Sequence, residues 1–466
     1  MARPFVSRSL AVLVVAGSVA LALASFSGAQ PAAGTKSTAS APSVVDSKPW
    51  TGDFDGMFAR RRIRLLVPYS RTLFFVENGK ARGLTADLAK DFETYLNQKH
   101  AKELGGRKIT IDLIPTTRDK LLTGLTAGMG DISGGNLTAT AARMEVADFV
   151  VPTERAPAEE LLISGPGAPA VATRDDLSGK KVNVRQASSY LESLNSLNEK
   201  LGAAGKPAVQ IVTMPDALED EDVLEMLNAG LFDFTVVDSW KARLWAPVEP
   251  QIKVHDDIAL RSGGTIGWAI RKQSPKLQAE LEGFYKTASQ QGLIEARLAG
   301  YQETLKEVAK SYTGPASERF EQGLAQFRKY GKQYPFDPLM LADEGFQDPA
   351  AGGAQGAAGG AGDFERNVQA ATKYIDQLLA RDFADARFSD LDRTLFTFAS
   401  YKAGADKISA MRKEAAKRGL DPNQWFNNVE LVTAEKMGIE TTAYVRRILQ
   451  YNVAYKLIAA GAGQKP

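Results

Sequence analysis

Between about residues 60 and 300, short apolar runs alternate with segments whose apolar residues recur at helical spacing. Short apolar runs bounded by turn residues are typical of buried strands, and recurrence every three or four positions is typical of helices. The predicted strands are Ile63–Val67, Ile109–Ile114, a short strand ending at Asn136, Lys181–Arg185, Val209–Val212, Phe232–Val237 and Gly264–Ile270. The predicted helices are Gly83–Leu96 with Thr85 as its N-cap, Thr117–Ala127, Ser188–Leu201, Ala217–Ala229 and Ser274–Gln291.

The order of these elements predicts two successive α/β lobes. A strand–helix–strand rhythm begins near Phe58 and is repeated by a second set at about residues 160–250. The strand Gly264–Ile270 then returns to the first lobe. Ligands of such sheets bind beyond the carboxyl ends of the strands, so we expect a ligand cleft within residues 58–300.

From Tyr301 to Leu457 the pattern is helical throughout, and runs of β-branched residues are missing. Turns such as Pro335–Pro338 and Gly419–Pro422 separate the helical segments. This part, residues 301–466, is predicted to be an all-α domain.

The N-terminus is typical of an exported protein. Arg3 and Arg8 precede an apolar stretch, Leu10–Ala24, that is too short for the ~20-residue helix that spans a bilayer. We interpret residues 1–29 as a signal peptide and residues 30–57 as a flexible leader, which places the mature protein in the periplasm. An uncleaved membrane anchor is the alternative.

Composition excludes several classes of function. The chain has 57 basic and 55 acidic residues, so its net charge gives no reason to expect nucleic acid as a partner. It has no cysteine and only two histidines, His100 and His255, which leaves no material for a disulfide, a thiolate nucleophile or a His-rich metal site. No cofactor and no metal are expected.

Three motifs in the α/β region resemble the bacterial extracellular solute-binding proteins that include the polar amino-acid binders. They are GLTADLAKDF, NLTATAARMEVADFVVP and GLFDFTVVDSW, and the similar region extends from Arg60 to Gln291. The resemblance implies that Arg143, with Thr140 beside it, clamps a ligand carboxylate and that Asp238 takes a ligand ammonium. A guanidinium holds a carboxylate with two parallel hydrogen bonds, and a buried aspartate can pair with an ammonium.

Other residues complete the expected site. Tyr69 and Ser70 follow the first strand, and Asn136 ends the third, at positions where the pocket wall of the first lobe is expected. Simpler interpretations remain open: Arg143 as a surface residue at a helix N-terminus, and Asp238 as a helix N-cap. An amino acid or a short wall peptide would suit Arg143 and Asp238, whereas an anion without an amine would leave Asp238 unpaired.

The helical region resembles the lysozyme-like, goose-type domain of cell-wall enzymes of the membrane-bound lytic murein transglycosylase F type. The similar segments are FRKYGKQYPFDPLMLADEGFQDP, FASYKAGADKISAMRKEAAKRGLDPNQWFNNVE and ETTAYVRRILQYNVAYKL. In that family a solute-binding domain precedes the lysozyme-like domain, as it does here. The resemblance therefore implies a two-lobed α/β periplasmic binding-protein domain followed by an all-α lysozyme-like domain.

The chain departs from that family where the chemistry is expected. The family's Gln-Glu-Ser sequence, whose glutamate is the general acid/base, is here Gln347, Asp348 and Pro349. The family's glycan-lining segment is replaced by an Ala/Gly linker, residues 350–362. The tyrosine of the family's Tyr-Asn-Ala-Gly motif matches Tyr401, but its asparagine does not match.

Another residue, Glu344, could replace Asp348 as the general acid. An aspartate is one methylene shorter than a glutamate, and a displacement of ~1 Å can cost on the order of 10²-fold in rate. Glu344 lies one helical turn before Asp348 and is a speculative replacement, for which a solvated helix position is the simpler interpretation.

Two functions of different class follow. One is a periplasmic sensor that binds a small carboxylate-bearing ligand, with its transglycosylase-like domain impaired or inactive. The other is an active peptidoglycan lytic transglycosylase that forms 1,6-anhydro products under control of the binding domain; Asp348 and the lost groove favour the first. An importer's binding component is a weaker alternative. The expected partners are the small polar ligand and peptidoglycan or a cell-wall enzyme, with peripheral outer-membrane association.

Overall fold

The computed structural model describes residues 48–77, 80–152, 157–228, 230–310 and 381–437, and also 441–442, 444–446, 448–449 and 453. Described residues up to 227 and from 233 to 306 form one unit, and those from 307 onward, with 228 and 230–232, form another. Across these ranges, no helix combines the length and the apolar character needed to cross a membrane.

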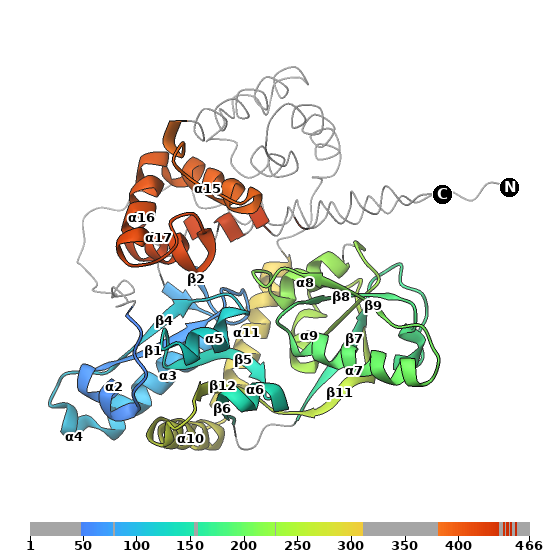
Figure 1. Ribbon diagram of the computed structural model, residues 1–466. Coiled ribbons are helices and arrows are strands. Elements are labelled where there is room, and N and C mark those ends of the chain that lie inside the picture. Colours follow the sequence, from blue (N-terminus) through green and yellow to red (C-terminus); the bar gives the residue numbers. More distant parts are fainter. Residues whose placement is uncertain are drawn as a thin grey trace. The chain divides into compact units, whose positions relative to one another are not determined.

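The first lobe of the α/β unit is built on a five-stranded sheet of order β4-β1-β5-β12-β6 (Figure 1). Strand β1 runs parallel to β4 and β5, whereas β12 is antiparallel to β5 and β6. The strands are β1 (Arg62–Val67), β4 (Thr110–Pro115), β5 (Ile132–Thr138), β6 (Ala147–Val150) and β12 (Ile266–Arg271), with the hairpin β2 (Phe75–Glu77) and β3 (Lys80–Arg82). The helices are α2 (Phe54–Arg60), α3 (Leu84–Lys99), α4 (Ala101–Leu104), α5 (Lys120–Thr126), α6 (Ala141–Val146) and α10 (Pro275–Gln290).

The core of this lobe lies where the apolar faces of α3 and α10 meet the sheet. The rings of Phe92 on α3 and Phe284 on α10 have centroids 5.2 Å apart, and Trp268 of β12 packs edge-on against Phe92. All three side chains are buried. Burial of aromatic surface of this size is a main source of stability in such a lobe.

The second lobe has its own five-stranded sheet, of order β11-β7-β10-β8-β9. Its strands are β7 (Ala158–Ser164), β8 (Lys181–Arg185), β9 (Gln210–Met214), β10 (Phe234–Asp238) and β11 (Lys253–Gly264), and its helices are η1 (Arg174–Leu177), α7 (Ser189–Ala203), α8 (Asp220–Asn228) and α9 (Ser239–Trp245). Strands β8, β9 and β10 are parallel, and β7 is antiparallel to β10 and β11. Central strand β10 is buried along its whole length, as its apolar sequence predicts.

The chain passes between the lobes twice. It leaves the first lobe after β6 to form β7, and it returns from β11 to β12. Parallel strands β5, β8 and β10 end at Thr138, Arg185 and Asp238, and residues at these carboxyl ends line one cavity. The two-lobed α/β prediction is confirmed, and the cavity lies at the carboxyl ends of strands from both lobes.

The predicted strands and helices of this unit are present, with ends that shift by a few residues. The N-cap prediction at Thr85 is wrong. Gly83 is the residue before α3, at φ +103°, and a Cβ there would lie 2.6 Å from the Leu73 carbonyl oxygen. Only glycine tolerates that conformation and that close approach. Thr85 instead lies inside the helix and donates to the Gly134 carbonyl oxygen at 3.0 Å.

The segment placed in the flexible leader includes ordered residues. Residues 48–57 pack on the first lobe, where the Trp50 amide donates to the Gly128 carbonyl oxygen at 2.9 Å. The guanidinium of Arg60 lies 3.9 Å from the centre of the Trp50 ring. Asp53 begins α2 by accepting from the Phe54 amide. The first lobe therefore starts about ten residues earlier than the apolar pattern indicates.

The described C-terminal residues are helical, as the sequence predicts and as a lysozyme-like domain requires. The elements are α15 (Asp390–Ala403), α16 (Ala405–Lys417), the π-helical turn η3 (Trp425–Val429) and α17 (Glu430–Met437). Phe396 packs edge-on against Trp425 with ring centroids 5.4 Å apart. A buried ion pair, Arg446 Nε to Glu430 Oε1 at 2.7 Å, joins the segment around residue 446 to α17.

Helix α11 (Leu293–Lys310) continues past residue 301, the predicted start of the helical domain, without a break. Several predictions fall outside the described residues. They are the signal peptide, Glu344, Gln347, Asp348, Pro349 and the Ala/Gly linker 350–362.

Candidate functional site

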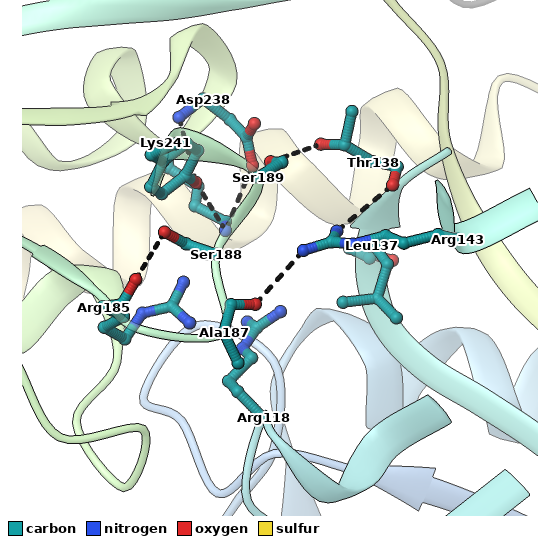
Figure 2. A pocket seen from close by; sticks show the side chains of 12 residues that line it. Arg118, Leu137, Thr138, Arg143, Arg185, Ala187, Ser188, Ser189, Asp238 and Lys241 are labelled. Atoms are coloured by element: carbon teal, nitrogen blue, oxygen red, sulfur yellow. Dashed lines mark hydrogen bonds and ion pairs between the residues drawn. The ribbon is translucent and has the colours of Figure 1, made fainter. Parts of the chain in front are cut away.

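A small cavity lies between the two lobes of the α/β unit (Figure 2). Its lining is polar and is shared by both lobes. The first lobe contributes Arg118, Asn136, Leu137, Thr138 and Arg143, and the second contributes Arg185, Ala187, Ser188, Ser189, Tyr190, Asp238 and Lys241. We call it the guanidinium cavity, because three arginine side chains converge on it.

Arg143 projects from α6 toward the second lobe. Its Nη1 donates to the Thr138 carbonyl oxygen at 3.2 Å and its Nη2 to the Ala187 carbonyl oxygen at 3.1 Å. Its Nε lies 3.4 Å from a carboxylate oxygen of Glu192, which is 37% exposed. Burial lowers the pKa of Arg143, Glu192 opposes this, and Arg118 and Arg185 reinforce it. This guanidinium is thus the least compensated cation on the wall, and an anion would stabilise it.

Arg118 binds directly across the cleft. Its Nε and Nη2 donate to the Glu219 carboxylate, at 3.0 Å and 2.7 Å, and its Nη1 donates to the Gly135 carbonyl oxygen at 2.6 Å. Both side chains of the ion pair are buried. A two-pronged pair of this kind fixes orientation as well as adding energy, so it holds the lobes in register.

A buried ionic network forms the second-lobe wall. Arg185 Nη2 donates to Asp220 Oδ1 at 2.6 Å, while the Tyr190 hydroxyl and the Lys241 ammonium bond to Asp220 Oδ2. Lys241 Nζ also lies 3.2 Å from Asp238 Oδ2. Burial alone would raise the pKa of Asp220, but Arg185 and Lys241 hold it well below its usual value. Asp220 is therefore a fixed anion between two cations.

Two buried polar atoms of this wall have no hydrogen-bond partner within the part of the chain that the structure describes. They are Asp238 Oδ1 and Arg185 Nη1, on side chains that are each only 3% exposed. A buried polar atom without a partner costs roughly 1–3 kcal/mol. The wall of the guanidinium cavity therefore contains one buried acceptor and one buried donor whose hydrogen bonding is not satisfied by the described residues.

The lobes also meet at a second place, which we call the carboxylate contact. There the Ser70 hydroxyl donates to Glu221 Oε1 at 2.6 Å, and Arg71 pairs with Asp222 at 3.2 Å and with Glu225. The neighbouring Thr72 hydroxyl accepts from the Trp245 indole at 3.0 Å and is also bonded to Glu221.

Burial dominates the titration of this contact. Together with Glu221 and Glu225 it raises the pKa of Asp222 to about 7, although Arg71 opposes the rise. Burial, with Glu225, raises the pKa of Glu249 to about 8.

The family model of the bacterial extracellular solute-binding proteins, family 3, matches residues 66–304, about half of the chain. The chain belongs to this family. The match covers both lobes and every residue that lines the guanidinium cavity.

Curated relatives are similar over a longer stretch. A membrane-bound lytic murein transglycosylase F of Ectopseudomonas mendocina is 26% identical over 417 residues, covering 83% of this chain and 80% of the relative. One from Desulfosudis oleivorans is 24% identical over 428 residues, covering 84% and 89%.

Solved structures also align with the family domain. An amino acid ABC transporter substrate-binding protein from Streptococcus pneumoniae bound to L-arginine aligns at 17% identity and a TM-score of 0.43, over 56% of this chain and 100% of that chain. An ancestral arginine-binding protein bound to arginine aligns at 21% identity and a TM-score of 0.43, over 52% and 98%.

Within this solute-binding domain, three of the predicted ligand residues line the cavity: Arg143, Asn136 and Asp238. Thr140 lies beside them and caps α6 by accepting from the Arg143 amide. Asp238 stands at the N-cap position of α9, but its side chain makes no capping hydrogen bond there.

Tyr69 and Ser70 are not among the lining residues of this cavity. Tyr69 packs edge-on against Phe74, and Ser70 belongs to the carboxylate contact.

Sequence reasoning missed Arg118, Arg185 and Lys241, all of which line the cavity. Arg185 carried a signal, because it is a charged residue at the carboxyl end of a predicted buried strand. Lys241 follows Asp238 by three positions, one turn into α9, where helical spacing brings the two side chains together. Arg118 carried no such signal, since its partner Glu219 is distant in sequence.

Tyr401, the remaining candidate from the transglycosylase motif, lies on α15 next to Lys402. The Lys402 ammonium lies 5.6 Å from the centre of the Tyr444 ring. The acid with which Tyr401 would act, Asp348, lies outside the described residues.

Proposed function

We propose that this protein is a periplasmic sensor whose solute-binding domain takes up a small carboxylate-bearing ligand between its lobes. We further propose that its transglycosylase-like domain has impaired or no catalytic activity. The observation that carries the first part is the convergence of Arg118, Arg143 and Arg185 on one cavity between the lobes.

The three arginines differ in how completely carboxylates of the protein pair with their guanidinium groups. Arg118 is held by Glu219 and Arg185 by Asp220, through two donors each. Arg143 has backbone oxygens and one half-exposed carboxylate. A ligand carboxylate that replaces those weak partners gains a charge-assisted hydrogen bond in a desolvated site, which supports a carboxylate rather than a neutral sugar as ligand.

The second part rests on sequence. Asp348 stands where the related enzymes place a glutamate, and residues 350–362 offer only Ala, Gly and one Gln where the glycan groove is expected. A misplaced acid and a missing wall each remove transition-state stabilisation that the other cannot restore. Peptidoglycan or a cell-wall enzyme then becomes a docking partner for the helical domain.

An active transglycosylase under ligand control is the second candidate. It is favoured by relatives of that name that align over 83% and 84% of this chain, so the similarity includes both parts.

A binding measurement tests the sensor proposal. Isothermal titration of the full chain against a set of small carboxylates should identify a ligand, and Arg143→Ala should weaken it by about 30-fold, equivalent to about 2 kcal/mol. Arg243→Ala is the matched control, because Arg243 lies on α9 of the same domain with 62% of its side chain exposed. Equal affinity of Arg143→Ala and the control for a confirmed carboxylate ligand would refute the assignment.

Digestion of purified murein tests the catalytic proposal. We expect no release of anhydromuropeptides by the unmodified chain, and none by Asp348→Glu, because an acid without a positioned sugar has nothing to protonate. Anhydro products that disappear in Asp348→Asn would establish the second candidate instead. Products that disappear only in Glu344→Gln would mean that the acid has moved one helical turn.

A further inference from the structure

Asp238 already has a cation supplied by its own chain. Lys241 Nζ lies 3.2 Å from Asp238 Oδ2, and the lysine side chain is 4% exposed. The same ammonium is bonded to Asp220 and lies 3.4 Å from the Tyr190 hydroxyl. Its position is therefore fixed by three groups, and it is not a surface lysine that happens to lie near.

The charges around the wall then balance without a ligand ammonium. Arg185 and Lys241 are met by Asp220 and Asp238, and Arg118 is met by Glu219. The remaining cation, Arg143, has only the half-exposed Glu192. Because Glu192 is shared with solvent, Arg143 is the cation of this set that an added anion would stabilise most.

A second ammonium at Asp238 would meet the field of Lys241. Both cations would share one buried carboxylate, and like charges repel strongly where water is excluded. The two unpartnered atoms would instead be satisfied by a different pair of ligand groups. Asp238 Oδ1 requires a hydrogen-bond donor, and Arg185 Nη1 requires an acceptor. A neutral hydroxyl supplies the donor without adding charge, and a carboxylate supplies the acceptor.

We propose that the guanidinium cavity selects 2-hydroxy carboxylates over the corresponding 2-amino acids, and that Lys241 sets this preference. The ligand carboxylate lies between Arg143 and Arg185, and the ligand hydroxyl donates to Asp238 Oδ1. This proposal rests on the proposed carboxylate function and narrows it to a ligand with one net negative charge.

Matched ligand pairs test the preference directly. Isothermal titration of the full chain is run with glycolate and glycine, lactate and alanine, and 2-hydroxyisocaproate and leucine. Within each pair only the hydroxyl and the ammonium differ. We expect the hydroxy member of any pair that binds to do so at least tenfold more tightly, equivalent to about 1.4 kcal/mol.

Lys241→Met removes the competing cation and keeps most of the side-chain volume. The variant should shift the preference toward the amino acid by at least tenfold, because Asp238 is then free to take an ammonium. Lys272→Met is the control, since Lys272 pairs with Asp148 on the surface of the same domain and its side chain is 45% exposed. It should leave the preference unchanged.

The outcomes separate the two proposals. Amino acids that bind as tightly as their hydroxy partners, or a folded Lys241→Met variant with unaltered preference, would overturn the role of Lys241 while leaving a carboxylate site in place. Absence of binding by both members of every pair would overturn the proposed function itself. If Lys241→Met does not fold, the comparison in the wild-type protein alone decides.

Discussion

The two lobes meet at two places of opposite chemical character. The guanidinium cavity is lined by Arg118, Arg143 and Arg185, whereas the carboxylate contact gathers acidic side chains around Arg71. In the cavity, one buried donor and one buried acceptor have no partner among the described residues. At the carboxylate contact, Ser70 and Thr72 bond directly to Glu221, so closure there needs only the protein.

Both places hold the lobes together, since Arg118 of the guanidinium cavity bonds to Glu219 across the cleft, but only the carboxylate contact has carboxylates whose pKa values lie near neutrality. We therefore expect pH to act on the carboxylate contact, because burial raises the pKa values of Asp222 and Glu249 to about 7 and about 8, whereas the proposed ligand would act on the guanidinium cavity.

The largest expected effect comes from breaking the ionic wall of the guanidinium cavity. Asp220→Ala leaves Arg185 and Lys241 buried without their shared anion, and should reduce the free energy of unfolding by about 3–5 kcal/mol. Urea denaturation of the full chain, followed by circular dichroism, measures it. Asp256→Ala removes one partner of an exposed pair with Arg243 and should cost less than about 0.5 kcal/mol. Similar losses in both variants would contradict a special role for Asp220.

A smaller effect is expected from pH at the carboxylate contact. Because burial raises the folded-state pKa of Asp222 above that of the unfolded chain, the folded state keeps a proton that the unfolded state has released. Stability therefore falls as the pH rises from about 5 to about 8, on the order of 2 kcal/mol. Asp222→Asn cannot titrate, so its denaturation midpoints should fall less over the same range. Parallel curves for the variant and the wild type would exclude Asp222 as the source.

The smallest effect compares one serine from each contact. Ser70 Oγ donates to Glu221 and accepts from two backbone amides, so Ser70→Ala should cost about 2 kcal/mol. Ser189 Oγ bonds Thr138 Oγ1 at 3.3 Å across the cavity, and Ser189→Ala should cost about 1 kcal/mol. Thermal unfolding of both variants measures the difference. A larger loss of stability in Ser189→Ala than in Ser70→Ala would mean that the hydrogen bond at the guanidinium cavity contributes more to lobe closure.

The sequence predicts the lobes well because their signal is local. Strand Lys181–Arg185 and helix Ser188–Leu201 are each visible in a short window of apolar spacing, and the structure places both there. Strands β7 and β11 were missed, because β7 has an apolar run of only three residues, Leu161–Ile163, and β11 is irregular, with shifts of register after His255.

The site was predicted less completely for a different reason. Arg143 and Asp238 belong to motifs that can be read along the chain. The pairing of Arg118 with Glu219 depends on how the second lobe meets the first, which no local pattern encodes. Helical spacing could have predicted the pairing of Lys241 with Asp238, whereas the family resemblance assigns a ligand ammonium to Asp238.

The direct bonds between the lobes also determine how fast a ligand can be exchanged. Arg118–Glu219 and Ser70–Glu221 must break before the cavity opens widely, because they cross the cleft that a ligand has to traverse. Opening then becomes a gate in series with diffusion. In a stopped-flow experiment, the observed rate of binding should level off at high ligand concentration instead of rising without limit, and the plateau is the opening rate of the gate. Departure of a bound ligand has the same ceiling, so tight retention can arise from a slow gate as well as from strong contacts.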